Sequence, residues 1–125
     1  MGRVVHFEIH AADCDRAERF YRRVFGWDVR RYEGAPVDYR LITTGAEGEA
    51  GINGAIVARQ GTADGQDAIV AFVCTIEVDD IDATEAAVRE AGGEQVVDRQ
   101  TMENVGSFSY FKDPEGNVFG AMQPA

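Results

Sequence analysis

The sequence predicts an α+β fold of two tandem βαβββ modules whose curved sheets enclose a central cleft. The first observation behind this prediction is an internal repeat: shifted by 67 residues, segment 6–29 falls on segment 73–96 with seven identical positions. The identical pairs are Ile9/Ile76, Asp13/Asp80, Asp15/Asp82, Glu18/Glu85, Arg22/Arg89, Gly26/Gly93 and Val29/Val96. The second observation is that both copies show the same order of patterns: a strand, an acidic turn, a helix, a glycine and another strand.

The first strand of the repeat is HFEIH, residues 6–10, in which apolar and polar side chains alternate. Its apolar face, which we expect to meet the helix, consists of Val5, Phe7 and Ile9. Its polar face, which must then line the cleft, consists of His6, Glu8 and His10. The matching strand of the second copy places at its cleft-lining positions Val73, Thr75 and Glu77.

A helix follows each of these strands. The spacings from Asp15 to Glu18 and from Asp82 to Glu85 are those of an N-terminal capping arrangement. Apolar residues at helical spacing form a stripe that we expect to be core, made up of Ala17, Phe20, Tyr21, Val24 and Phe25 in the first copy and of Ala87, Val88 and Ala91 in the second. Gly26 and Gly93 stand where the helices end.

Three more strands complete each module. They are predicted at 27–33, 38–44 and 52–59 in the first module and at 94–100, 106–112 and 117–123 in the second. DPEG at 113–116 favours a type I turn, and the polar segment 99–108 is a candidate flap over a ligand. The aromatic residues on strands, part of which should border the cleft, are Trp27, Tyr39, Phe108, Tyr110 and Phe111.

The segment 60–67, QGTADGQD, is polar and contains glycine, so we interpret it as the linker between the modules. The prediction is therefore one domain spanning residues 1–125, with module one at 1–59 and module two at 68–125.

The formal net charge of −10, with 22 acidic against 12 basic residues, disfavours nucleic acid and anionic membrane surfaces as partners. The longest apolar stretch, 68–76, is too short to cross a bilayer, and we expect a cytoplasmic location. Cys14 and Cys74 are too few for a disulfide framework or a thiolate zinc site. Cys74 alternates with apolar neighbours, which predicts that it is buried.

Four segments carry a resemblance to a known superfamily: VVHFEI, AADCDRAERFYRRVFGW, VDDIDATEAAVREAGG and YFKDPEGNVFGAMQP. Together they resemble the vicinal-oxygen-chelate superfamily of lactoylglutathione lyase, bleomycin resistance proteins, fosfomycin-modifying enzymes and extradiol dioxygenases. The likeness is strongest to small bacterial proteins related to lactoylglutathione lyase. It implies a metal-binding cleft, whose ion is held by residues of the first and fourth strands of each module and chelates two neighbouring oxygens of the substrate.

Carried over to this chain, the resemblance places His6 at the first-strand metal ligand. The position in the second module that matches it is Val73, and the last-strand glutamate falls on Gly120. The fourth strand of the first module offers Asn53 or Gly54. We therefore expect the usual four-ligand site to be largely lost, with His6 left to hold at most a weakly bound divalent ion such as Zn, Ni, Mn or Fe.

Other interpretations of the same residues stay open. Glu8 and Glu77 are candidate catalytic acids or bases if they share the cleft, or solvated carboxylates at its rim. His6, Glu8 and His10 are a metal site only if side chains about 7 Å apart lean together, and His10 at the strand exit is alternatively solvated.

The function we predict is binding of a small molecule, by a protein that pairs into a homodimer to cover exposed sheet edges. The alternative is a divalent-metal-dependent lyase, isomerase or dioxygenase that acts on a substrate with vicinal oxygens, with its metal anchored by His6.

Overall fold

The computed structural model describes residues 2–60 and 69–125, and its chain divides into two compact units. The first unit is His6–Phe72, and the second is Val73–Ala125 together with the start of the chain up to Val5. The α+β class and the two βαβββ modules are confirmed. The central cleft and the single-domain boundaries stay predictions, and the linker lies, from residue 61 onward, outside the described residues.

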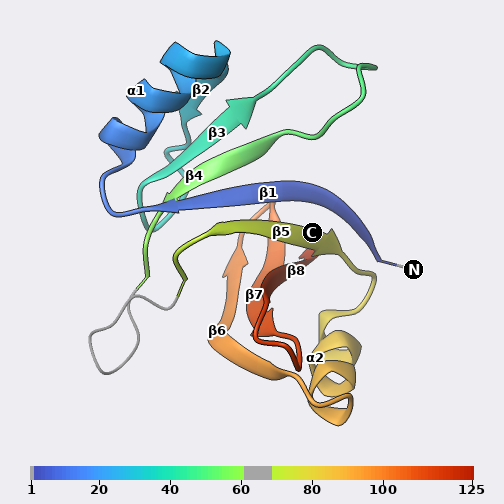
Figure 1. Ribbon diagram of the computed structural model, residues 1–125. Coiled ribbons are helices and arrows are strands. Elements are labelled where there is room, and N and C mark those ends of the chain that lie inside the picture. The colour runs from blue at the N-terminus through green and yellow to red at the C-terminus, as the bar shows by residue number, and fades with distance from the viewer. Residues whose placement is uncertain (1, 61–68) are drawn as a thin grey trace. The chain divides into compact units, whose positions relative to one another are not determined.

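The first unit contains β1 (Arg3–Ala11) from His6 onward, α1 (Cys14–Phe25), β2 (Asp28–Arg31), β3 (Tyr39–Thr43) and β4 (Gly54–Ala58). Its strands lie in the order β2-β3-β4-β1, with β1 parallel to β4 and the other pairs antiparallel. Helix α1 packs on one face of these strands (Figure 1). The core between them consists of Ile9, Ala11, Cys14, Val29, Ile42 and Ile56.

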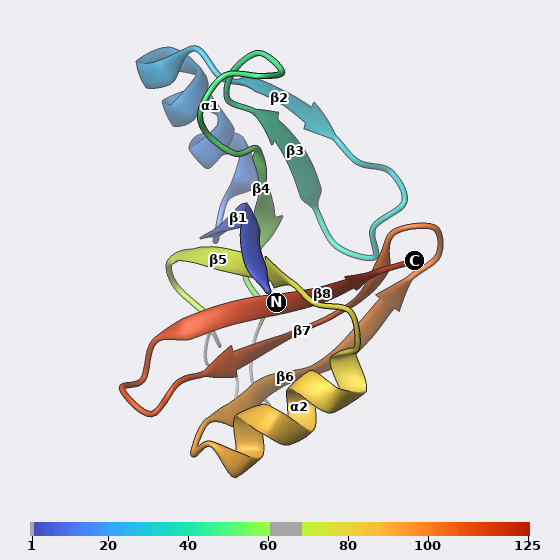
Figure 2. The same ribbon diagram turned by 90° about the vertical axis from the view of Figure 1, so that its right-hand side faces the viewer.

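The second unit contains β5 (Phe72–Glu77), α2 (Ile81–Glu90), β6 (Glu94–Met102), β7 (Gly106–Lys112) and β8 (Val118–Pro124). The strand order β6-β7-β8-β5, with β5 parallel to β8, repeats that of the first unit. Helix α2 packs against β6, β7 and β8 (Figure 2). This identical order confirms that the repeat in the sequence is a duplicated structural unit. Neither α1 nor α2 is long and apolar enough to cross a membrane, and the described residues contain no other helix.

The helix caps differ from the prediction. The N-caps are Asp13 and Asp80, whose side chains accept hydrogen bonds from the backbone N–H of Arg16 and Ala83. These aspartates are also identical between the two copies, and they precede the predicted caps by two residues. The helix start therefore leaves the side chains of Asp15, Glu18 and their counterparts available for another role.

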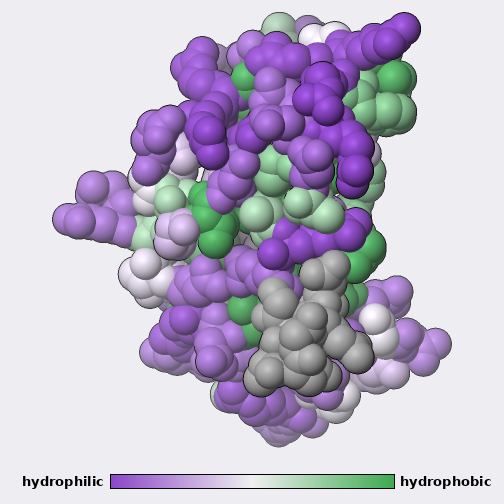
Figure 3. All heavy atoms as spheres, turned by 90° about the vertical axis from the view of Figure 1, so that its left-hand side faces the viewer, coloured by the Kyte–Doolittle hydropathy of each residue, from purple (hydrophilic) through white to green (hydrophobic). Residues whose placement is uncertain are grey.

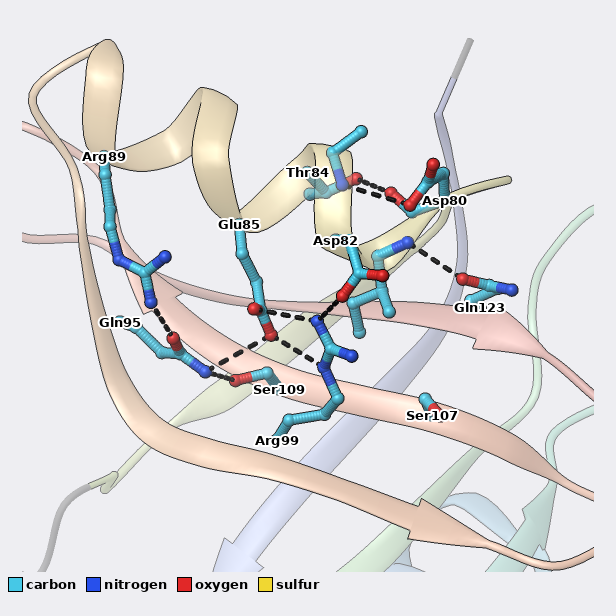
Figure 4. A network of polar contacts seen from close by, with 12 residues as sticks. Asp80, Asp82, Thr84, Glu85, Arg89, Gln95, Arg99, Ser107, Ser109 and Gln123 are labelled. Carbon is cyan, nitrogen blue, oxygen red and sulfur yellow. Dashed lines mark hydrogen bonds and ion pairs between the residues drawn. The ribbon is translucent and has the colours of Figure 1, made fainter.

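That role is binding an arginine from a strand. In the first unit, Arg40 of β3 contacts Glu18 at 3.0 Å and Asp15 at 2.8 Å, and also forms a two-pronged ion pair with Asp38. In the second unit, Arg99 of β6 binds Glu85 at 2.8 Å and also contacts Asp82 (Figure 4). We call these two groups the arginine clamps. Each one ties the first turn of a helix to the sheet beneath it.

Helix α1 is less buried than its apolar stripe predicted. Phe20, Val24 and Phe25 are 56%, 53% and 58% exposed, whereas Ala17 and Tyr21 pack against the core. Only part of the stripe therefore reaches the core, and its other members stay at the surface. The prediction that Phe20 and Phe25 are core residues is wrong.

Two predictions in the second unit are also wrong. Cys74 is exposed, because α2 packs on β6, β7 and β8 and leaves this end of β5 uncovered. The predicted flap at 99–108 is a β-hairpin in which β6 and β7 pair as far as Met102 and Gly106. Asn104 turns the chain with a φ of 65°. The DPEG turn is confirmed, with Gly116 N–H donating to the Asp113 carbonyl at 3.0 Å and a φ of 84° at Gly116.

Candidate functional site

Three polar side chains stand in a row on β1 of the first unit, on the face opposite the core. Phe7 and Ile9 pack with the core on the α1 side, so the alternation of the strand directs His6, Glu8 and His10 to the other side. His10 Nε2 lies 3.6 Å from Glu8 Oε1, and His6 Nε2 lies 3.9 Å from Glu8 Oε2. The three side chains therefore lean together.

Tyr39 of β3 joins this row. It pairs with Val57 of β4, which pairs in turn with His10 of β1, so Tyr39 projects from the same face of the sheet. Its hydroxyl donates a hydrogen bond of 2.9 Å to Glu8 Oε2 and lies 3.1 Å from His6 Nε2. We call His6, Glu8, His10 and Tyr39 the polar cluster.

The hydrogen-bond directions in the cluster follow from counting protons. The Tyr39 hydroxyl has one hydrogen atom, which it donates to Glu8. Its oxygen can therefore only accept from His6, so His6 Nε2 carries a hydrogen atom and Nδ1 carries the lone pair.

Burial sets the electrostatics of the cluster. It raises the pKa of Tyr39, and the neighbouring Glu8 charge raises it further, so the hydroxyl stays protonated. Burial also lowers the pKa of His6, while the Glu8 charge acts in the opposite direction. The neutral imidazole is therefore favoured at neutral pH.

Exposure changes steeply along the cluster. The His6 side chain is 25% exposed, that of Glu8 is 7% exposed, and that of His10 is fully buried. The alternative that His10 is solvated at the strand exit is wrong, because the strand continues to Ala11. A molecule from solvent therefore meets His6 first.

The remaining predicted site residues lie on β5 and β8 of the second unit. Thr75 pairs with Gly120 and both are buried, as is Val73, whereas Glu77 is exposed. A side chain at Gly120 would meet the Thr75 hydroxyl at 3.4 Å, an ordinary contact. The cleft-lining and catalytic roles of these residues stay predictions.

The two candidates on the fourth strand of the first module are occupied otherwise. The Asn53 side chain accepts a hydrogen bond of 2.9 Å from the backbone N–H of Thr44. Gly54 pairs with Phe7 on the helix side of the sheet, where a Cβ atom would lie 2.5 Å from the Phe7 carbonyl. Neither position offers a ligand to the polar face in this arrangement.

The metal ion that the superfamily resemblance implies can be tested against the side chains that are available here to bind it. Within residues 2–60 and 69–125, no group of three or more histidine, cysteine, aspartate or glutamate side chains is placed to hold an ion. His6 Nε2 donates its hydrogen to Tyr39, so it has no lone pair to offer while that bond persists. The polar cluster as arranged does not fit a metal ion at His6 Nε2.

Sequence reasoning missed Tyr39 as a site residue. It marked Tyr39 only as one of five aromatic residues on strands, because β3 meets β1 through β4 and the contact spans 31 positions of the chain. The one signal was its alternation with Arg40, which predicts opposite faces for the two side chains.

The family model of the glyoxalase/bleomycin resistance protein/dioxygenase superfamily matches residues 3–120. The chain belongs to this superfamily. A glyoxylase-like domain-containing protein of Didymella fabae is 30% identical over 119 residues, covering 94% of this chain and 90% of the relative. A putative glyoxylase of Mycobacterium tuberculosis is 40% identical over 48 residues, covering 38% of this chain and 18% of that protein.

Solved structures of other proteins share the fold. A methylmalonyl-CoA epimerase in complex with methylmalonyl-CoA has a TM-score of 0.65 at 18% identity, covering 100% of this chain and 96% of that one. The methylmalonyl-CoA epimerase of Mycobacterium tuberculosis has a TM-score of 0.61 at 17% identity, covering 97% and 87%. At this identity the likeness establishes the fold alone.

Proposed function

We propose that this superfamily member binds a small organic molecule against the polar cluster of its first unit, with the usual four-ligand metal site largely lost. One observation carries the proposal: the Tyr39 hydroxyl joins His6 and Glu8, at 3.1 and 2.9 Å, in a superfamily where the His6 position serves as a metal ligand. A small number of precisely placed polar groups, such as the partly exposed His6 held by buried partners, usually fixes the orientation of a small ligand.

The second candidate is the metal-dependent lyase, isomerase or dioxygenase with its ion at His6. The superfamily register of His6 favours it, and Zn, Ni, Mn or Fe would be the candidate ions. Binding of the ion at Nε2 requires His6 to release Tyr39 and to present a lone pair there. His6 Nε2 cannot bind an ion while it donates its hydrogen to Tyr39, so ligand binding by the intact polar cluster and metal binding at Nε2 exclude each other.

Ligand binding is tested with bleomycin, which the superfamily description names, and with methylmalonyl-CoA, which is bound in a solved relative. The single tryptophan, Trp27, stacks on Tyr21 in the first unit, so its fluorescence and the melting temperature both report on binding there. We expect a saturable response to one of the two probes that weakens at least tenfold in Glu8→Gln and not in the exposed control Glu90→Gln. A response that Glu8→Gln leaves unchanged, or none to either probe, would contradict the proposal.

We also propose that the protein is a cytoplasmic homodimer. The support for the dimer is the exposed part of the α1 stripe, where three large apolar side chains are more than half open to solvent. Hydrophobic side chains indeed lie open among hydrophilic ones on the face of the molecule shown in Figure 3.

A further inference from the structure

We infer that the polar cluster is a proton-transfer site, in which His6 takes a proton from the bound molecule and Tyr39 connects His6 to the Glu8 carboxylate. The inference rests on the proposed function, since it needs a small molecule beside His6. It adds a reaction step to a site otherwise proposed only to bind.

The order of the groups supports this assignment. Of the three polar-cluster side chains on β1, His6 is the most exposed, at 25%, and its Nδ1 lone pair is not directed to Tyr39. Glu8, at 7%, forms the buried end of the hydrogen-bond series. A series that runs from an accessible base to a buried carboxylate is the arrangement that orients a histidine and stabilises its protonated form.

The strand between β1 and β3 leaves room for this series, and His10 Nε2 lies 3.6 Å from its carboxylate, Glu8 Oε1. Strand β4, which lies between β1 and β3, has the sequence GAIVA and contributes no charged side chain. Ala55, the partner of Glu8 on β4, is too small to block the reach of Tyr39 from β3. Arg40 points to α1 and its acids, and Arg59 contacts the His10 backbone carbonyl at 3.4 Å.

The step balances without a co-reactant. His6 Nδ1 takes the proton of a weakly acidic C–H, and the electron pair of that bond stays on the ligand. The Nε2 proton then passes to Tyr39 Oη as the Tyr39 proton passes to Glu8, which leaves neutral His6 and neutral Glu8. Return of the proton to the ligand, at the same or another atom, restores the site.

The test uses 5-nitrobenzisoxazole, a small neutral carbon acid. Loss of its C–H proton to a base forms the nitrile and breaks the N–O bond, releasing a coloured phenolate, so the rate reports a positioned base directly. We expect saturable turnover faster than that given by an equal concentration of imidazole.

Three variants assign the roles. His6→Gln should lower kcat by about 100-fold or more, the usual contribution of a general base. Tyr39→Phe should lower kcat by about tenfold with little change in KM, because Tyr39 acts through His6. Glu8→Gln should lower kcat by about tenfold as well. Tyr32→Phe is the matched control, since Tyr32 packs edge-on against Tyr39 at 6.4 Å and stands outside the polar cluster.

Wild-type turnover no faster than imidazole, or a folded His6→Gln that keeps the wild-type rate, would overturn the inference. So would Tyr39→Phe and Glu8→Gln variants that both match the wild type. These failures are distinguishable from failure of the proposed function, because binding of bleomycin or methylmalonyl-CoA is read independently from Trp27 fluorescence.

Discussion

At the scale of single residues, the hydrogen bonding of the polar cluster depends on Tyr39 as much as on the histidines. A hydroxyl held 2.9 Å from a buried carboxylate fixes the hydrogen-bonding state of the imidazole on its other side. His6 is thereby a defined tautomer with a defined open nitrogen. A strand with two histidines and a glutamate is consequently a hydrogen-bonded site here, although the same residue types commonly bind metals.

The lowered pKa of His6 makes stability depend on pH. The unfolded chain takes up a proton at His6 near its ordinary pKa of about 6.5, whereas the folded chain resists it down to a lower pH. We therefore expect the free energy of unfolding to fall as pH drops below about 6.5, until the folded-state pKa is passed. Urea denaturation between pH 5 and 8 measures this slope. His6→Gln should flatten it, and an unchanged slope would contradict the assignment.

At the scale of elements, the arginine clamps hold each helix to its sheet. The Arg40 side chain is only 9% exposed and satisfies three carboxylates, whereas the Arg99 side chain is 33% exposed. Arg40→Leu should destabilise the protein by about 2 kcal/mol, less than a fully buried pair because the acids reach solvent. Arg99→Leu, the matched control, should cost measurably less. Equal losses in the free energy of unfolding, measured by chemical denaturation, would show that burial of the arginine does not decide how strongly a clamp stabilises the protein.

The pairing of β4 with β1 depends on Gly54. A Cβ atom there would lie 2.5 Å from the Phe7 carbonyl and 2.7 Å from its ring, so Gly54→Ala should destabilise by about 1–3 kcal/mol. Gly45→Ala is the control, because its nearest contact, Glu49 Oε2 at 3.5 Å, is an ordinary one. Thermal melts of the two variants measure the difference. Equal melting temperatures would contradict the close approach of the two strands.

The elements also show what sequence patterns can and cannot predict. Alternation in β1 correctly separated Phe7 and Ile9 from His6 and Glu8, because a strand face follows from period alone. Local spacing failed for Asp15 and Glu18, whose partner Arg40 is more than twenty positions away. The same limit hid Tyr39. A contact between strands that are distant along the chain leaves no local signature.

At the scale of the whole molecule, the exposed apolar residues of α1 predict self-association. We expect light scattering to give twice the chain mass of 13.6 kDa for the wild type. Phe20→Ser combined with Phe25→Ser should shift the protein to 13.6 kDa, because it removes the exposed aromatic rings of the helix. Ala86→Ser on the exposed side of α2 is the control. A wild-type monomer would contradict the homodimer.

Duplication explains why the fold of the whole chain was predictable although its site was only partly so. The same pattern of strands and helices occurs twice in the sequence, so each copy predicts the same order of elements. Both units share that order. The chemistry of the first unit has no counterpart in the repeat, since Val73 and Thr75 stand where His6 and Glu8 stand in the first copy. Fold and site therefore depend on different residues of the same strands.

The most direct test of the central claim is the metal content of the protein purified without a histidine tag. We expect far less than one ion per chain, and no rise in melting temperature when Zn, Ni, Mn or Fe is added. His6 Nε2 donates to Tyr39, and the described residues place no group of three or more histidine, cysteine, aspartate or glutamate side chains to hold an ion with Nδ1. One ion per chain that disappears in His6→Ala would contradict the account and establish the metal-dependent alternative.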